Sequence, residues 1–146
     1  MSTIMIVGAT RGIGLELTKQ YANEGNQVIA CARDTANASL LNEIASGSEN
    51  IKIEQLDIAD AGSIESASSR IGEEAIDSVI IVAGWVGGMP DNQTIDNIDI
   101  DEWHNTLNIN TIGPLLVAKA FKSNLAASGN GNLMILSSQL AASTWP

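Results

Sequence analysis

The sequence predicts an α/β fold, in which a doubly wound parallel sheet of five strands carries helices on both faces. Short apolar runs recur along the 146 residues, amphipathic segments separate them, and no change in composition interrupts this alternation. Continuously apolar runs are typical of strands buried on both faces. Strands that alternate with helices form right-handed βαβ units and therefore a parallel sheet. We expect residues 1–146 to form one domain, since a chain of this length provides one proper core.

Four of the predicted strands are strongly apolar and one is mixed. The apolar runs are residues 4–7, 28–32, 79–82 and 133–136. The mixed run, residues 51–56, contains Lys52 and Glu54 and is expected at an edge of the sheet.

Three predicted helices follow the first three strands. The first begins near Gly12 and stops at Gly25, and the third follows Asp60, a suitable N-cap residue. Apolar residues at helical spacing define their expected buried faces. In chain order these are Ile13, Leu17 and Tyr21; Leu40, Leu41 and Ile44; and Ile64, Ala67 and Ile71.

A fourth, longer helix is expected from Asp99 to about Leu125. Glu102 lies three residues after Asp99, the spacing of a capping box. Pro114 should kink this helix or remove one backbone bond. The acidic segment from Pro90 to Asn97 is expected to be a solvated surface loop.

Residues suited to ligand binding follow every predicted strand. A glycine-rich segment follows the first strand, Arg33 the second, Asp57 the third, Ala83-Gly84 the fourth and Ser137-Ser138 the fifth. Because ligands bind beyond the carboxyl ends of parallel strands, all these residues should lie at one edge of the sheet.

The glycine-rich segment indicates a nucleotide site. Its glycines are Gly8, Gly12 and Gly14, and Thr10, Arg11 and Ile13 lie between them. Glycine allows a tight turn whose backbone N–H groups approach a pyrophosphate, and the following helix adds its positive end. A purely structural turn is the alternative, but the position directly after a buried strand favours nucleotide binding.

The spacing G-x-x-x-G-x-G resembles the signature of the short-chain dehydrogenase/reductase family, in which a threonine stands at the position of Val7. Ala83-Gly84 resembles the second half of the family's N-N-A-G motif, with Ile81 and Val82 in place of both asparagines. The resemblance extends along the whole chain. It implies a Rossmann-type dinucleotide-binding fold with strand order 3-2-1-4-5. It also implies hydride transfer between a nicotinamide and a small carbonyl or alcohol substrate.

The charges near the glycine turn favour NADP(H) over NAD(H). An NAD enzyme usually ends its second strand with an acidic ribose ligand, whereas Ala32 occupies that place here and Arg33 follows. Together with Arg11, Arg33 resembles the basic pair of NADP-preferring family members, and guanidinium groups suit a 2′-phosphate. The alternative makes Arg33 a solvated residue at a strand end and Asp34 a poor ribose ligand.

Further site residues are implied by the resemblance. Asp57 and Ile58 would contact the adenine, with a turn leading into the next helix as the plainer interpretation of Asp57. Asn110 would organise a proton-relay water, whereas the nearby Asn108 could instead lie on the helix surface. Ser138 would hold the substrate oxygen, and a serine-rich turn is the alternative.

The family's catalytic tyrosine and lysine would lie after Pro146, and Tyr21 is the only tyrosine in the sequence. We therefore expect the chain, incomplete at its C-terminus relative to the family, to bind cofactor but to turn over poorly. Residues 133–136 would then form an exposed apolar edge, which predicts self-association into a homo-oligomer.

Composition excludes other classes. The net charge of −10 argues against nucleic-acid and anionic-membrane partners. One cysteine, Cys31, excludes an internal disulfide and is expected to be buried, and the N-terminus has no secretion signal, so we expect a cytoplasmic protein. No metal site is expected, because His104, the only histidine, has no ligand cluster around it.

Three alternatives stay open. The chain could be a non-catalytic NADP(H)-binding module in regulation or signalling. A methyltransferase is disfavoured, because it needs an acidic ribose ligand where Ala32-Arg33 stand. Trp85 and Met89 either line a substrate mouth or cap the core.

Overall fold

The computed structural model describes residues 1–88 and 94–138 of the chain. The described residues form one five-stranded sheet in the order β3-β2-β1-β4-β5, in which every neighbouring pair is parallel. The strands are β1 (Thr3–Val7), β2 (Gln27–Ala32), β3 (Ile51–Gln55), β4 (Ser78–Ile81) and β5 (Asn132–Ile135). The predicted fold class and strand order are confirmed, with the mixed strand β3 at an edge.

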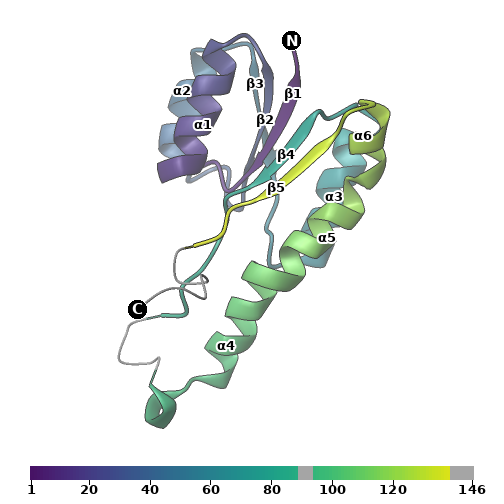
Figure 1. The fold of residues 1–146 in the computed structure, drawn as a ribbon. Helices are drawn as coiled ribbons and strands as arrows, with labels where there is room; N and C mark the ends of the chain where they lie inside the picture. Colours follow the sequence, from purple (N-terminus) through teal and green to yellow (C-terminus); the bar gives the residue numbers. More distant parts are fainter. Residues whose placement is uncertain (89–93, 139–146) are drawn as a thin grey trace.

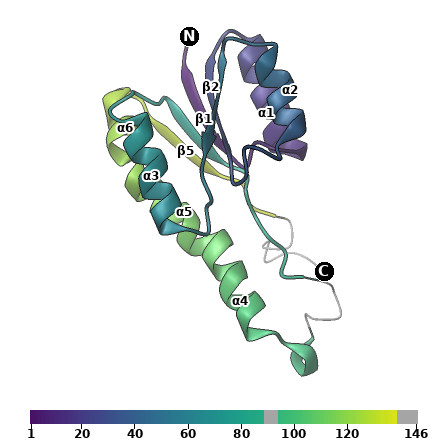
Figure 2. The same ribbon diagram turned by 180° about the vertical axis from the view of Figure 1, so that it is seen from behind.

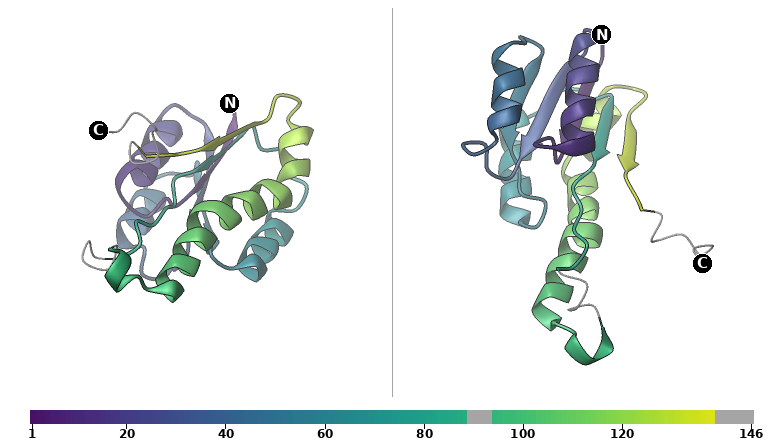
Figure 3. Two further views of the ribbon diagram at one scale, coloured as in Figure 1. Left: turned by 60° about the horizontal axis from the view of Figure 1, so that its bottom comes forward. Right: turned by 90° about the vertical axis from the view of Figure 1, so that its left-hand side faces the viewer.

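Helices cover both faces of the sheet (Figures 1 and 2). α1 (Gly12–Asn23) and α2 (Ser39–Ser46) lie on one face. α3 (Ala61–Ile71), α5 (Gly113–Ala120) and α6 (Lys122–Ala127) lie on the other. α4 (Ile100–Leu107) extends past the carboxyl edge of the sheet, as the two views of Figure 3 also show. This edge therefore has a helix beside it as well as the loops that follow the strands.

Alternate residues of β1 enter two different core clusters. Met5 and Val7 pack with Phe121 on the side of α3, α5 and α6, whereas Ile4 and Ile6 pack on the side of α1 and α2. All four β1 residues are at most 6% exposed. Burial on both faces is why the strand sequence is continuously apolar instead of alternating.

The predicted buried face of α1 is wrong, because a neighbouring row of residues along the helix is buried instead. Leu15, Thr18 and Ala22 are buried, while Ile13 is 60% exposed, and Leu17 and Tyr21 pack at the rim of the core. Thr18 tolerates burial because its hydroxyl donates to the Gly14 carbonyl at 2.8 Å.

The second predicted face needs a smaller correction and the third needs none. Leu41 of α2 is buried and Ile44 packs against the same core, but Leu40 is 54% exposed. In α3 the predicted face of Ile64, Ala67 and Ile71 is buried as expected. Arg70 of this helix is half exposed, yet its Nε lies 2.6 Å from Glu54 Oε1 and ties α3 to β3.

The long fourth helix is interrupted, which corrects the prediction of one helix from Asp99 to Leu125. A π-helical turn, η3 (Asn108–Ile112), joins α4 to α5, and a break at Phe121 separates α5 from α6. Pro114 has no N–H to donate to the Asn110 carbonyl four residues earlier, which removes one α-helical bond. The Gly113 N–H donates to the Asn108 carbonyl, five residues back.

Asp99 caps α4 as predicted. Its carboxylate accepts from the N–H groups of Asp101 and Glu102. The Glu102 carboxylate accepts from the indole N–H of Trp85, so the side chain that a capping box would use contacts a different segment. In the predicted loop, Ile95–Asn97 form a short 3-10 helix and residues 90–93 lie outside the described residues.

The residues of β5 are exposed. Leu133, Met134, Ile135 and Leu136 are 40–51% exposed, in contrast to the buried residues of β1, β2 and β4. The predicted exposed apolar edge is therefore present in the described structure, and self-association stays a prediction.

Candidate functional site

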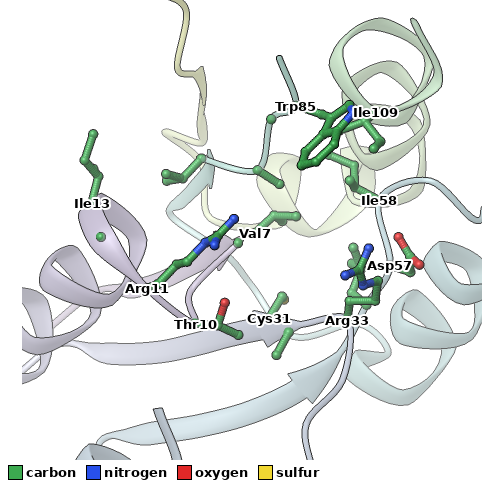
Figure 4. A pocket seen from close by; sticks show the side chains of 17 residues that line it. Val7, Thr10, Arg11, Ile13, Cys31, Arg33, Asp57, Ile58, Trp85 and Ile109 are labelled. Carbon is green, nitrogen blue, oxygen red and sulfur yellow. The ribbon is translucent and has the colours of Figure 1, made fainter. Parts of the chain in front are cut away.

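A pocket of about 470 Å³ lies at the carboxyl edge of the sheet, lined by residues that follow β1 to β4 (Figure 4). All the predicted cofactor residues except Gly14 line it. They are Gly8, Thr10, Arg11, Gly12, Ile13, Arg33, Asp57, Ile58, Ala83 and Gly84. The chain topology thus brings together residues that are up to 76 positions apart, from Gly8 to Gly84.

The three glycines of the turn are needed for different reasons, either a close backbone contact or a positive φ. Gly8 has a φ of +96°, and a Cβ there would lie 2.7 Å from the Ala83 backbone nitrogen. A Cβ on Gly14 would lie 2.0 Å from the Gly8 carbonyl oxygen, so α1 can start this close to the turn only without a side chain. Gly12 has a φ of +52°, and a Cβ there would meet no atom within 4 Å. The turn therefore offers an uncrowded backbone at Gly12, where a phosphate group can approach.

Two amides of the turn are already in use. The N–H groups of Gly8 and Ala9 donate to the Cys31 carbonyl at 3.2 and 3.0 Å, which joins the turn to β2. An anion must therefore use amides from later in the turn and from the start of α1. The first residues of α1, Gly12 and Ile13, line the pocket together with the N-cap residue Arg11, so the positive end of the helix lies at the pocket.

Arg11 and Arg33 both reach the pocket and both have exposed side chains. In Figure 4 Arg11 extends from the glycine turn, and Arg33 lies on the side of the pocket that carries Asp57. Among residues 1–88 and 94–138 neither guanidinium forms a salt bridge. Two cations are therefore available for an anionic ligand.

Asp34 is engaged in its own turn. Its two carboxylate oxygens accept from the backbone N–H of Asn37 at 3.1 Å and from Asn37 Nδ2 at 2.6 Å. These hydrogen bonds hold the pKa of Asp34 below its usual range. Both carboxylate oxygens of Asp34 are thus already occupied by hydrogen bonds within this turn.

Asp57 and Asp60 have different structural roles. Asp57 lines the pocket, and its Oδ1 accepts from the Ala59 N–H at 3.0 Å. Asp60 caps α3 by accepting from the Gly62 N–H at 2.8 Å. The structure is thus compatible with both sequence interpretations of this segment, and adenine contact by Asp57 stays a prediction.

Asn110 contacts the backbone that follows Gly84. Its Oδ1 accepts from the Trp85 N–H at 2.8 Å, and its Nδ2 donates to the Trp85 carbonyl at 2.7 Å. Ser138 follows β5 at the same edge of the sheet. Neither Asn110 nor Ser138 is among the pocket-lining residues, so their catalytic roles stay predictions.

Several pocket residues were not predicted as cofactor contacts. Ile109 lines the pocket from the π-helical turn. In the sequence, only its position next to the predicted site residue Asn110 indicated that it could contact a cofactor. The sequence left Trp85 either at a substrate mouth or as a cap on the core, and the structure places it in the wall of this pocket. Met89, considered with it, lies outside the described residues.

Cys31 also lines the pocket, from inside the core. Burial first, and the charge of Glu54 second, raise the pKa of its thiol far above the usual range. The thiol therefore stays protonated in the fold, which agrees with the expected buried strand residue.

In the described part of the chain, no three histidine, cysteine or acidic side chains come together as a metal site. None of the described helices has the length and hydrophobicity needed to cross a bilayer.

Comparison with known proteins decides the family. The family model for short chain dehydrogenases matches residues 2–146. The chain belongs to the short chain dehydrogenase family. Membership confirms the resemblance found in the glycine turn and in Ala83-Gly84, and it makes the chain an oxidoreductase by family.

Short chain dehydrogenases of known sequence and structure align along nearly the whole chain. An uncharacterized oxidoreductase from Schizosaccharomyces pombe is 33% identical over 141 residues, which are 94% of this chain and 54% of that protein. A carbonyl reductase from Pseudomonas aeruginosa PAO1, solved in complex with NADP, is 31% identical with a TM-score of 0.88 over 98% of this chain and 64% of that one. A short-chain dehydrogenase/reductase from Burkholderia multivorans with bound NADP, 24% identical, shares the fold with a TM-score of 0.85 over 99% of this chain and 63% of that one. The chain spans about half the length of the curated relatives it matches.

Proposed function

We propose that this protein is an NADP(H)-dependent short-chain dehydrogenase/reductase that transfers hydride between the nicotinamide and a small carbonyl or alcohol substrate. The main support for the proposal is that the glycine turn and the side chains of Arg11 and Arg33 line the same pocket. A pyrophosphate needs uncrowded amides at a helix N-terminus, and a 2′-phosphate needs cations. Both requirements are met in one place.

The end of β2 supports NADP(H) over NAD(H). Ala32, only 2% exposed, has no side-chain acceptor for a ribose 2′-hydroxyl, and both Asp34 carboxylate oxygens accept from Asn37. Arg33 follows directly and is exposed. The P. aeruginosa carbonyl reductase that was solved with NADP gives further support.

In this proposal the parts of the cofactor would lie in a definite order along the sheet edge. The glycine turn and the start of α1 would hold the pyrophosphate, Arg11 and Arg33 the 2′-phosphate, and Asp57 with Ile58 the adenine. Ala83 and Gly84 leave room beside the turn because their side chains are minimal. The bound cofactor supplies the hydride, and Ser138 would donate a hydrogen bond to the substrate oxygen.

Calorimetry with NADP+ and NAD+ tests the proposal. Two charge-assisted bonds of about 1.5–3 kcal/mol each set the scale, so we expect Arg11→Ala/Arg33→Ala to weaken NADP+ binding by at least about tenfold and to leave NAD+ binding nearly unchanged. Lys119→Ala/Lys122→Ala is the matched control, because it removes the same charge from exposed positions of α5 and α6 outside the pocket. If the arginine variant distinguishes NADP+ from NAD+ as well as the unmodified chain does, the assignment of the 2′-phosphate site is wrong.

A further inference from the structure

Trp85 is a large aromatic side chain in the wall of the pocket. It is 41% exposed and lines the pocket together with Ile58 and Ile109 (Figure 4). Ile58 belongs to the core cluster against which Ile109 packs. Asp57 precedes Ile58, so these apolar side chains and one carboxylate belong to the same end of the pocket.

The backbone of Trp85 is fixed by its two hydrogen bonds with the Asn110 side chain. Asn110 follows Ile109 in the π-helical turn, and this turn is itself attached to the β3–α3 loop by a 2.6 Å bond from Asn108 Nδ2 to the Ala59 carbonyl. Trp85 is thus held against the segment that carries Ile58, although it belongs to the strand end of β4.

The indole is fixed separately from the backbone. Its N–H donates to the carboxylate of Glu102, a half-buried residue in the first turn of α4. The Glu102 N–H in turn donates to the Asp99 carboxylate at 3.1 Å. An indole held in this way loses little side-chain freedom when a ligand packs against it.

A flat apolar wall beside a carboxylate suits a purine. Aromatic rings stack on nucleobases, and a carboxylate accepts a hydrogen bond from an exocyclic amine. The wall contains Ile58, which directly follows Asp57 after β3, and Arg33 lies on the side of the pocket that carries Asp57. In a dinucleotide bound across the sheet edge, this is the side of the adenosine half.

From this geometry we infer that Trp85 is a cofactor contact that forms the aromatic wall of the adenine subsite, and that Glu102 is the residue that positions its indole. The inference rests on the proposed function. It adds a contact that the glycine turn, the arginines and Asp57 do not supply.

Tryptophan fluorescence tests the inference while Trp85 itself stays unchanged. The double variant Trp103→Phe/Trp145→Phe leaves Trp85 as the only tryptophan of the chain. We expect adenosine 2′,5′-bisphosphate, which lacks nicotinamide, to change its emission, and nicotinamide mononucleotide, which lacks adenine, to leave it unchanged. The inference is overturned if the bisphosphate binds and the emission of Trp85 does not respond.

Affinity for the same bisphosphate gives a second measurement. Stacking of about 1–3 kcal/mol per base predicts that Trp85→Ala binds it about 5- to 150-fold more weakly, and Trp85→Phe should recover most of the loss. Trp103→Ala is the matched control, because this α4 residue is 55% exposed and does not line the pocket. Glu102→Ala should weaken binding by about 2- to 12-fold, and Glu102→Gln, which retains an acceptor for the indole, should restore it.

The outcomes separate this inference from the proposed function. An unmodified chain that binds neither NADP+ nor the bisphosphate would contradict both. An unmodified chain that binds both ligands, with Trp85→Ala equal to Trp103→Ala in affinity, would overturn only the role of Trp85. Circular dichroism shows which variants are folded. If Trp85→Ala is unfolded, the fluorescence measurement on Trp103→Phe/Trp145→Phe decides the role of Trp85.

Discussion

Gly14→Ala reverses the effect that helix propensity predicts. Gly14 lies in the first turn of α1, where alanine normally stabilises a helix by about 1 kcal/mol relative to glycine. Here an added Cβ would lie 2.0 Å from the Gly8 carbonyl oxygen and 2.9 Å from the Gly8 carbonyl carbon. Carbon–oxygen contacts are ordinarily about 3.3 Å, so the glycine turn must move by roughly 1 Å.

The obstructing atoms are backbone, and the Gly8 N–H is bonded to β2, so the strain is not relieved by a rotamer change. Overpacking of this kind costs about 3 kcal/mol, and the gain in helix propensity offsets about 1 kcal/mol of it. We expect the free energy of unfolding to fall by about 2 kcal/mol and Tm to fall by about 7 °C. NADP+ affinity should fall by at least about tenfold, because the displaced turn is the proposed pyrophosphate site.

Urea unfolding and calorimetry with NADP+ measure the two effects. Gly47→Ala is the control: this glycine follows α2 with a φ of −96°, and the nearest atom to an added Cβ is 3.8 Å away. It should leave binding unchanged and stabilise the chain by up to about 1 kcal/mol. Equal or higher stability of Gly14→Ala, with unchanged NADP+ affinity, would refute the steric reasoning.

Three further predictions concern the core. Phe121→Ala, at a side chain with 0% exposure, should lower the free energy of unfolding by about 3–5 kcal/mol in urea titrations, and a loss below about 1 kcal/mol would contradict its central place in the core. Arg70→Met should lower the free energy of unfolding by about 1–3 kcal/mol because the buried Glu54 carboxylate loses its cationic partner and keeps the Gln55 N–H as a donor, and Glu54→Leu/Arg70→Met should recover most of that loss. A double variant as unstable as the single one would contradict this. The pKa of the Cys31 thiol is raised in the fold, so above about pH 8.5 the thiol loses its proton only in the unfolded chain. The contribution of the buried thiol to the free energy of unfolding is therefore intact below that pH and declines by about 1.4 kcal/mol per pH unit above it. Cys31→Ala should remove this part of the pH dependence, and identical pH profiles would show that the thiol is not buried.

The strands and α3 were predictable because local sequence determines them. Apolar runs that are buried on both faces have few other interpretations, and in α3 the cap Asp60 and the spacing of Ile64, Ala67 and Ile71 agree. The face of α1 was not predictable from apolar residues alone. Its buried stripe contains Thr18, and only the bond to the Gly14 carbonyl makes that burial acceptable.

The interruption of the long helix depends on tertiary packing. Pro114 indicates a lost bond, but the π-helical turn also needs Gly113, where a Cβ would lie 2.4 Å from the Ile58 carbonyl oxygen. The pocket residues likewise fall into those that local sequence predicts and those that depend on tertiary packing. The glycine turn and Arg33 follow strands directly, so their positions were predictable from the sequence. Trp85 and Ile109 come together through long-range contacts, among them the hydrogen bond between Trp85 and Asn110, which are 25 residues apart.

Calorimetric titration of the unmodified chain with NADP+ and with NAD+, at two salt concentrations, tests the central claim most directly. A glycine turn flanked by two guanidinium groups should bind NADP+ more tightly than NAD+, and added salt should reduce that difference as it screens the 2′-phosphate. Binding of neither dinucleotide by the folded chain, or equal affinity for both at low salt, would contradict the account.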